Sequence, residues 1–473
     1  MKKFTKILLI GCLLVTVSCN NWLDVEPKSQ VKDKDLFASE MGFKEALSGV
    51  YSLMTKEALY GKELTFGWLG VLGQEWTSVP YNYEDDQKYD FENAASEVRI
   101  DSVWTGLYNA IANANKLLKE LEGKENLFSG DNYFIIKGEV LALRAYLHFD
   151  LLRIFGASCT VGMERIAIPY VTEYAPTIFP QEKVGDFVGK VLNDLQDAAK
   201  CLENDPILTG RTVSEIDDNG YLMNRQGHLN YYAVKGLMAR VYLYKGDYAN
   251  AEVCAKEVIG SGCFEWVKQE NLTNESVADL TFSTEHLFAL NIVTLGNIVD
   301  KYLDGGNNSF ALEESRLSEY YGSSYDYRYL YLFKTGVGMS NTLRYLKKYD
   351  QLESVSWAQS YRNKLPLICL PEMYYILAEC RYHSSGDVLE PLNEVCRHRG
   401  VADLSEADLS AFETLLLAEY RKEVIGGGQL FFQYKRLNRS VVPGTDVDLA
   451  GEGRYVIPMP KEELENPGWV SNQ

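Results

Sequence analysis

Apolar residues return at intervals of three and four over several long stretches of the chain, a spacing that predicts helices. Between residues 103 and 121 these positions share one face, which Trp104 widens. A second stretch, Val140 to Ile154, is followed by Gly156, a residue typical of the position after a helix. The chain is therefore predicted to be mainly α-helical.

Two further helices are predicted at Tyr231–Lys245 and Tyr248–Ile259, joined only by Gly246 and Asp247. Such a short connection requires an antiparallel hairpin. The small and tyrosine residues around the turn are spaced as in a tetratricopeptide repeat, and a weaker copy of the pattern lies at Met373–His398. Because one helix pair leaves a face uncovered, several pairs must stack. The predicted fold is an all-α, tetratricopeptide-like scaffold.

Long stretches without sustained helical periodicity separate these helices. Loops beyond about 15 residues usually carry function or are disordered. The 32 tyrosines of the chain, many of them in these stretches, argue against disorder. We therefore expect the stretches to form a binding surface. They lie near residues 59–96, 157–180, 206–227 and 264–344.

The N-terminus has the pattern of a lipoprotein signal. Lysines at positions 2, 3 and 6 precede an apolar run that ends at Ser18 and Cys19. The run is shorter than the about 20 apolar residues that span a membrane. We predict a signal peptide at 1–18, a single domain at 19–473 and lipid attachment at Cys19, whose several acyl chains would hold the protein on a membrane. An ordinary cleaved signal with an incidental cysteine is the alternative.

Composition narrows the choice of partner and chemistry. With 66 acidic and 47 basic residues the formal net charge is −19, which would repel nucleic acid and anionic lipid surfaces. Nucleic acid is therefore excluded as an expected partner. The apolar fraction of 46% supplies ample material for a core.

The cysteines give no sign of a metal site. Of nine, Cys12 and Cys19 belong to the signal and the anchor, and the other seven are scattered without a Cys-x-x-Cys pair. We expect them to be small buried apolar residues, with a Cys380–Cys396 bridge as the open alternative. No cofactor and no metal are expected.

Short motifs follow one another in order along nearly the whole chain. They are Trp22–Pro27, Arg144–His148, Asp326 with Arg328, Lys348–Tyr349, Leu365–Ile368 leading into Glu372–Tyr374, Leu392–Gly400, and Ile457–Pro460 with Asn466–Gly468. In this order they resemble the SusD/RagB family of glycan-binding outer-membrane lipoproteins of Bacteroidetes. One departure is the stretch 427–433, where the family usually carries an arginine and an aspartate that this chain lacks.

The resemblance implies a tetratricopeptide-like core and a lipid-anchored protein exposed on the outer membrane. It implies that the protein binds oligosaccharide or polysaccharide and delivers it, without cleaving it, to a SusC-like TonB-dependent transporter. Capture of peptides or glycoproteins on the same fold remains open.

A glycan site needs exposed flat rings, on which the apolar faces of sugars stack, and polar groups that bind hydroxyls. Two of the long stretches offer this mixture, 59–96 (the first loop) and 264–344 (the second loop). Any one of their aromatics could instead belong to the core. Asp326 and Arg328 could simply brace the start of a helix. The candidates are Trp68, Trp76, Tyr81, Asn82, Tyr83, Tyr320, Tyr321, Tyr325, Tyr327 and Arg328, led by Trp76, Tyr81 and Tyr83.

A glycosidase is the competing class, because such enzymes also surround a sugar with aromatics and paired carboxylates. The obvious acidic cluster is Glu84, Asp85 and Asp86, and consecutive acids in a loop are typical of a solvated surface. The chain has no H-E-x-x-H and no G-x-S-x-G motif. No catalytic residue is predicted, and the expected protein is not an enzyme.

Overall fold

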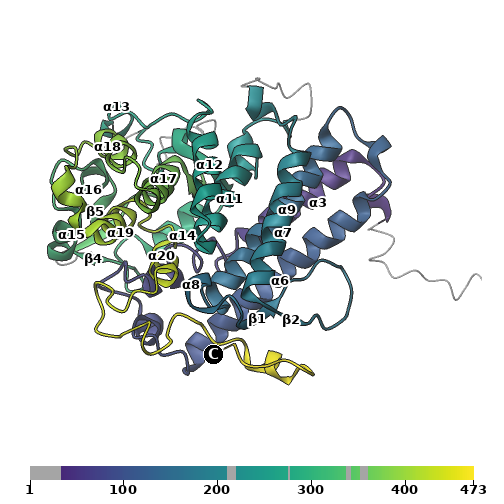
Figure 1. Cartoon of the computed structure of the whole chain (residues 1–473), viewed down its shortest axis with the longest axis horizontal. Coiled ribbons are helices and arrows are strands. Elements are labelled where there is room, and N and C mark those ends of the chain that lie inside the picture. Colours follow the sequence, from purple (N-terminus) through teal and green to yellow (C-terminus); the bar gives the residue numbers. More distant parts are fainter. Residues whose placement is uncertain (1–33, 210–219, 275–276, 337–341, 352–360, 473) are drawn as a thin grey trace, which may run out of the picture.

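The computed structural model describes residues 34–209, 220–274, 277–336, 342–351 and 361–472. The predicted signal peptide, Cys19 and the Trp22–Pro27 motif lie outside these residues. Helices dominate the remainder (Figure 1), so the prediction of a mainly α-helical fold is confirmed. Within the part that the structure describes, no helix combines the length and apolar character needed to cross a bilayer.

Long helices form the body of the molecule. α7 packs between α6 and α9, while α12 packs between α11 and α17. In Figure 1 the blue helices α6, α7 and α9 lie on one side, the green helices α17 to α19 on the other, and α11 and α12 between them. The longer helices are α3 (Glu40–Met54), α6 (Ala94–Leu121), α7 (Asn132–Phe155), α9 (Val184–Cys201), α11 (Tyr231–Lys245), α12 (Tyr248–Ile259), α17 (Leu370–Ser384), α18 (Leu389–His398) and α19 (Phe412–Glu423).

The predicted hairpin is confirmed with the same bounds as the sequence pattern. Gly246 ends α11 with φ of 81°, a left-handed conformation that favours glycine, and the Asp247 side chain accepts a hydrogen bond from the Asn250 amide at 3.2 Å. The weaker copy forms the pair α17 and α18. The tetratricopeptide-like scaffold is therefore present.

The rest of the described chain contains short helices, 3₁₀ turns and small antiparallel sheets, many of them in the stretches without helical periodicity. The short helices are α4 (Trp68–Leu72), α5 (Glu84–Gln87), α8 (Cys159–Gly162), α13 (Glu270–Thr273), α14 (Leu295–Tyr302), α15 (Glu314–Tyr321), α16 (Tyr327–Tyr331) and α20 (Leu430–Arg436). The 3₁₀ turns are η1 (Tyr81–Tyr83), η2 (Glu125–Leu127), η3 (Pro206–Thr209), η4 (Arg225–Gly227), η5 (Ser283–Glu285), η6 (Glu406–Ala411) and η7 (Lys461–Glu465).

Three small sheets tie these stretches together. β3 pairs with β7, β1 with β2, and β6 lies between β4 and β5, all antiparallel. The strands are β1 (Ile166–Pro169), β2 (Gln181–Lys183), β3 (His286–Asn291), β4 (Leu312–Glu313), β5 (Phe333–Thr335), β6 (Leu343–Leu346) and β7 (Lys364–Cys369).

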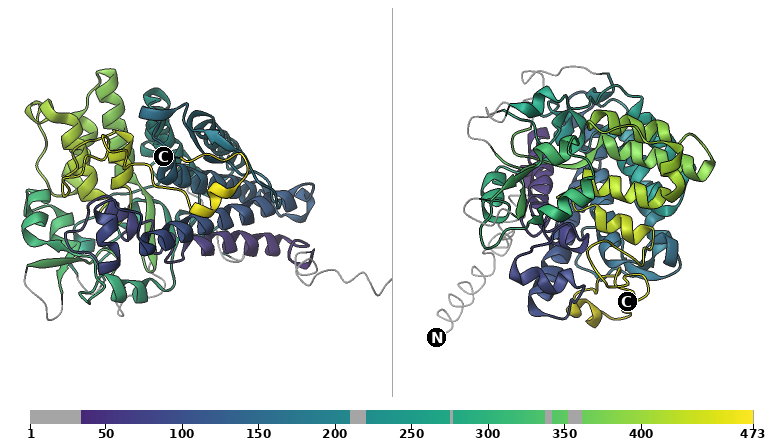
Figure 2. Two further views of the ribbon diagram at one scale, coloured as in Figure 1. Left: turned by 90° about the horizontal axis from the view of Figure 1, so that it is seen from below. Right: turned by 90° about the vertical axis from the view of Figure 1, so that its left-hand side faces the viewer.

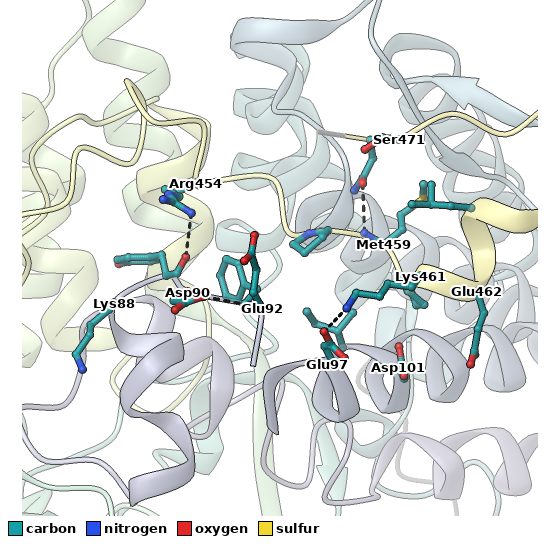
Figure 3. Close-up of a pocket in the computed structure, with 17 residues that line it drawn as sticks. Lys88, Asp90, Glu92, Glu97, Asp101, Arg454, Met459, Lys461, Glu462 and Ser471 are labelled. Atoms are coloured by element: carbon teal, nitrogen blue, oxygen red, sulfur yellow. Dashed lines mark hydrogen bonds and ion pairs between the residues drawn. The ribbon is translucent and has the colours of Figure 1, made fainter. Parts of the chain in front are cut away.

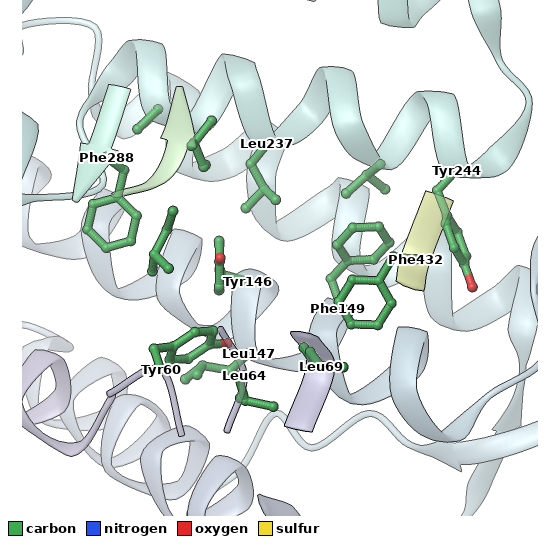
Figure 4. Packing of buried hydrophobic residues seen from close by; sticks show 14 of the residues in the cluster. Tyr60, Leu64, Leu69, Tyr146, Leu147, Phe149, Leu237, Tyr244, Phe288 and Phe432 are labelled. Atoms are coloured by element: carbon green, nitrogen blue, oxygen red, sulfur yellow. The ribbon is translucent and has the colours of Figure 1, made fainter. Parts of the chain in front are cut away.

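The first loop contributes directly to the hydrophobic core. Tyr60, Leu64 and Leu69 pack beside Tyr146 and Leu147 of α7 (Figure 4), and the Tyr60 hydroxyl donates to Asp150 Oδ2 at 2.7 Å. This part of the stretch 59–96 was expected to be surface, and that expectation is wrong. Its large apolar side chains stabilise the fold by burial against α7.

Gln429 lies in the stretch 427–433, where the sequence departs from the family pattern. Its Oε1 accepts a hydrogen bond from Arg153 Nη1 at 2.9 Å, so a neutral amide is a partner of the buried guanidinium.

All seven cysteines in the part of the chain that the structure describes are free. Cys380 and Cys396 are buried without a disulfide, which excludes the alternative bridge.

Candidate functional site

The two loops predicted to carry the site meet through their backbones. The Thr77 amide donates to the Ala311 carbonyl at 3.0 Å, and the Ala311 amide donates to the Ser78 carbonyl at 3.0 Å. The ring of Phe310 lies against Trp76 and Tyr83, with centroids 5.9 and 5.1 Å apart. Segments more than 200 residues apart in the sequence thus form one aromatic cluster.

Most aromatics of the first loop face inward. Trp68, Trp76 and Tyr83 are exposed by 0%, 2% and 1%, and each makes a buried hydrogen bond. Trp76 Nε1 donates to the Phe66 carbonyl at 2.8 Å, and the Tyr83 hydroxyl donates to Glu63 Oε1 at 2.8 Å. The prediction that these three rings form an exposed stacking surface is wrong. Rings of this size bury 150–250 Å² each, so they complete the core once a second layer covers them.

The acidic cluster beside them is split between core and surface. Glu84 and Asp85 are exposed, whereas Asp86 is fully buried. Asp86 accepts from Trp68 Nε1 at 3.0 Å and forms an ion pair with Arg99. Burial raises the pKa of Asp86 to about 6, and the nearby Arg99 guanidinium offsets only part of that effect.

Arg328 and Tyr321 of the second loop are also buried. The Tyr321 hydroxyl donates to the Lys422 carbonyl at 3.1 Å. Arg328 is exposed by 1% and bridges Asp326 at 2.7 Å and Glu423 at 2.9 Å, while Asp326 Oδ1 caps the Arg328 amide at the start of α16. These two residues therefore cannot contact a ligand at the surface. Arg328 braces a helix start, the structural alternative considered for it.

The remaining candidates divide into two exposed groups. Tyr81, exposed by 87%, and the exposed Asn82 lie on η1, which Arg99 holds by donating to the Asn82 carbonyl at 3.1 Å. Tyr325, exposed by 76%, and the half-buried Tyr327 lie beside the end of α18, where the Tyr327 amide donates to the Arg399 carbonyl at 2.9 Å.

Tyr320 is half-buried, with the Arg421 guanidinium 4.3 Å from its ring centroid. Among the predicted aromatic candidates, Tyr81 and Tyr325 are therefore the rings that are exposed on the surface.

The surface also holds hollows that the sequence did not indicate. The first, of about 680 Å³, lies between α6 and the C-terminal segment and is strongly charged (Figure 3). Lys461 forms an ion pair with Glu97 across it. Its other charged lining residues are Lys88, Asp90, Glu92, Asp101, Arg454 and Glu462.

A second hollow, of about 930 Å³, lies between α3 and α14 and has many small polar side chains. Tyr51 and His228 form one wall, and His228 Nδ1 contacts Glu139 Oε2 at 2.9 Å. Burial alone would raise the pKa of Glu139, but His228 and Arg225 outweigh it and lower that pKa to about 2. Its uncharged polar lining is Ser48, Ser52, Thr55, Asn291, Thr294 and Asn297.

The third hollow, of about 400 Å³, is aromatic and lies beside the middle of α6. Trp104, Tyr108 and Trp469 form its walls. Sequence reasoning assigned Trp104 to packing, and it is buried, but nothing in the sequence placed residue 469 beside it. Among the residues that the structure describes, no group of three or more His, Cys, Asp or Glu side chains is placed to hold a metal ion.

Stacked helix pairs, with exposed aromatic and amide side chains on the connecting loops, make this a protein with a tetratricopeptide-like scaffold. The family model SusD-like_3, described as "Starch-binding associating with outer membrane", matches residues 21–214. The SusD-like protein P38 of Formosa agariphila is 24% identical over 269 residues, 56% of this chain and 47% of that protein. The chain thus spans about half the length of this curated relative.

Solved structures agree over nearly the whole length. A SusD superfamily protein from Bacteroides thetaiotaomicron has a TM-score of 0.73 at 21% identity, covering 92% of this chain and 100% of that one. Surface glycan-binding protein A from Bacteroides fluxus has a TM-score of 0.68 at 17% identity, covering 92% and 98%. The superpositions show the fold, and the sequence matches are also to SusD-like proteins, so the chain is similar to this family in both fold and sequence.

Proposed function

We propose that this chain binds oligosaccharide or polysaccharide at the cell surface and delivers it to a SusC-like TonB-dependent transporter, without cleaving it. The family match and the glycan-binding structural relative support the ligand class. The proposed location is the outer membrane, with a lipid anchor at Cys19. The transporter rests on the family resemblance alone, whereas the anchor rests on that resemblance and on the lipoprotein-signal pattern of the N-terminus.

The observation that carries the proposal is the presentation of Tyr81. Its ring is 87% exposed, yet its turn is fixed by the buried Tyr83 and by the bond from Arg99 to the Asn82 carbonyl. A ring held outward on a rigid turn offers stacking area to a sugar face at a small cost in conformational entropy. The exposed Asn82 amide beside it can bind hydroxyls.

Of the acidic residues 84–86, Asp86 is withdrawn from the surface. Retaining and inverting glycosidases need two carboxyl groups that flank the scissile bond. Asp86 is instead buried in contact with Trp68 and Arg99, out of reach of a surface ligand. Tyr81 and Asn82 form an exposed surface, here called the Tyr81 surface. A binding role fits this surface better than catalysis.

The test is isothermal titration calorimetry of the purified chain against starch, laminarin, plant and mucin oligosaccharides. We expect micromolar to millimolar affinity, about 4 to 8 kcal/mol, since a shallow surface leaves much of the ligand hydrated. Tyr81→Ala should weaken binding about tenfold through loss of the stacked ring. Phe134→Ala, which removes another ring exposed by 50%, is the matched control and should leave affinity unchanged.

Other outcomes point to other functions. Binding of peptides with no sugar bound would favour a peptide receptor on the same fold. Release of reducing sugar during the titration would show a glycosidase. Equal affinity in wild type and Tyr81→Ala would move the site away from η1.

A further inference from the structure

One face of α6 forms the floor of two of the hollows. Positions three and four apart lie on the same side of a helix, so this face follows a stripe about 18 Å long. Glu97, Ile100 and Asp101 line the charged hollow, whereas Trp104, Thr105, Tyr108 and Asn109 line the aromatic one. The C-terminal segment crosses this face, as the yellow chain over the blue helices shows (Figure 2), and η7 separates the two hollows.

The rings of the aromatic hollow are held in place by bonds within the protein. Trp104 Nε1 donates to Glu463 Oε1 at 3.0 Å, the Tyr108 hydroxyl donates to the Pro169 carbonyl at 3.0 Å, and Trp469 Nε1 donates to the Phe179 carbonyl at 3.1 Å. The polar atom of each ring is thus hydrogen-bonded within the protein, and this bond fixes the orientation of the ring. What the half-exposed Tyr108 and Trp469 offer a ligand is their apolar faces.

The rim of this hollow supplies polar groups that suit hydroxyls. Thr105, Asn109 and Thr177 are exposed there, and Asn466 is half-exposed. Within the described lining the only charged side chain is Glu463, and its carboxylate already accepts from Trp104 and, at 2.8 Å, from Asn466 Nδ2. A negative group with no cation beside it disfavours anionic ligands. The lining therefore favours a neutral, hydroxylated ring.

We propose that the aromatic hollow is a second saccharide-binding site, separate from the Tyr81 surface, which takes a neutral sugar unit stacked between Tyr108 and Trp469. This inference rests on the proposed function, since it assumes a glycan ligand. A sugar has apolar C–H faces, which complement the aromatic rings of the hollow, and peripheral hydroxyls, which complement the polar groups at its rim. The volume of about 400 Å³ is in the range of small-molecule sites.

The competing occupant is a protein partner, because Ile178 and Val470 nearby are exposed by 53% and 52%. The concave shape and the polar rim favour the sugar, since protein interfaces bury much larger areas. The variants can separate the two. Trp469→Ala removes the wall, Trp469→Phe keeps a ring but loses Nε1, and Val470→Ala is the matched control on the same segment, outside the lining.

The experiment is calorimetry of the purified chain against maltoheptaose, laminarihexaose and cellohexaose, combined with tryptophan fluorescence. We expect two classes of site for a sugar that binds. Trp469→Ala should weaken one class about tenfold and reduce the ligand-induced fluorescence change, Trp469→Phe should keep most of the affinity, and Val470→Ala should keep all of it. Tyr81→Ala should weaken only the other class.

Three results would overturn the inference. If Trp469→Ala binds every sugar as the wild type does, the hollow is not a saccharide site while the proposed function stands. If Trp469→Phe loses as much as Trp469→Ala, ring stacking is not the cause. If the wild type binds none of the oligosaccharides used in either titration, both the proposed function and this second site fail.

Discussion

Helix α7 and the loop segment 68–86 both place large side chains and a carboxylate in the core, but they do so in different ways. α7 is covered on all sides by neighbouring helices, and its buried Glu139 is surrounded by His228 and Arg225. The rings of the loop segment pack against Phe310 of the second loop, and its buried Asp86 has Arg99 as its cationic partner. Both carboxyl groups are buried, yet their pKa values are shifted in opposite directions from the usual ones, to about 2 for Glu139 and to about 6 for Asp86.

The comparison shows that an irregular segment can be as much a part of the core as a helix. Large rings can be buried in either setting, because burial depends on the apolar area removed from water and not on backbone type. Polar groups differ, because a buried charge is stabilised only by the particular partners that the fold brings to it. Three changes test this contrast, from the largest expected effect to the smallest.

Trp76→Ala tests whether the loop is core. We expect a loss of about 3–5 kcal/mol in the free energy of unfolding, since the change leaves a cavity against Phe310 and removes the bond to the Phe66 carbonyl. Chemical denaturation monitored by circular dichroism measures it. Tyr81→Ala, five residues away but exposed, should change stability by no more than about 0.5 kcal/mol. A small loss for Trp76→Ala would mean that its ring does not support the fold.

Glu139→Gln tests the compensated carboxylate of α7. A folded pKa of about 2 against a usual 4.5 means that the native state favours the charged form. This stabilisation is present above pH 4.5 and is lost as the pH falls towards 2, by roughly 3 kcal/mol in total. The free energy of unfolding, measured by chemical denaturation at several pH values in this range, should fall more steeply with decreasing pH for the wild type than for the variant. An equal pH dependence in the two proteins would contradict the assigned network.

Asp86→Asn tests the less compensated carboxylate and should give the opposite sign. A folded pKa of about 6 against 3.8 means that the native state favours the protonated form. Wild-type stability should therefore fall as the pH rises from 3.8 to 6, by at most roughly 3 kcal/mol, and the asparagine variant should lack this fall. If the two proteins keep a constant difference in stability across that window, the Arg99 contact compensates Asp86 fully.

Helical periodicity located the scaffold accurately. The hairpin bounds at Tyr231–Lys245 and Tyr248–Ile259 matched, and the helices predicted from residue 103 and from Val140 were extended by the structure to begin at Ala94 and Asn132. The extension of α6, residues 94–102, is largely polar, whereas that of α7 contains four consecutive apolar or aromatic residues, Tyr133 to Ile136, which do not follow the three- and four-residue spacing of a helix face. The sequence identified the aromatic candidates as a group but did not predict which of them are buried, since Trp76 is buried and Tyr81 is exposed.

The sequence by itself determined the helical pairs and the aromatic content of the loops, because these follow from local spacing and composition, and its ordered motifs carry the resemblance to the SusD/RagB family. The tertiary structure decided which rings are buried, how Glu139 and Asp86 titrate, and that Trp469 stands beside Trp104 and Tyr108. These properties depend on contacts between residues distant in the sequence. No local pattern encodes such contacts, because the exposure of a side chain is set by whatever segment folds over it.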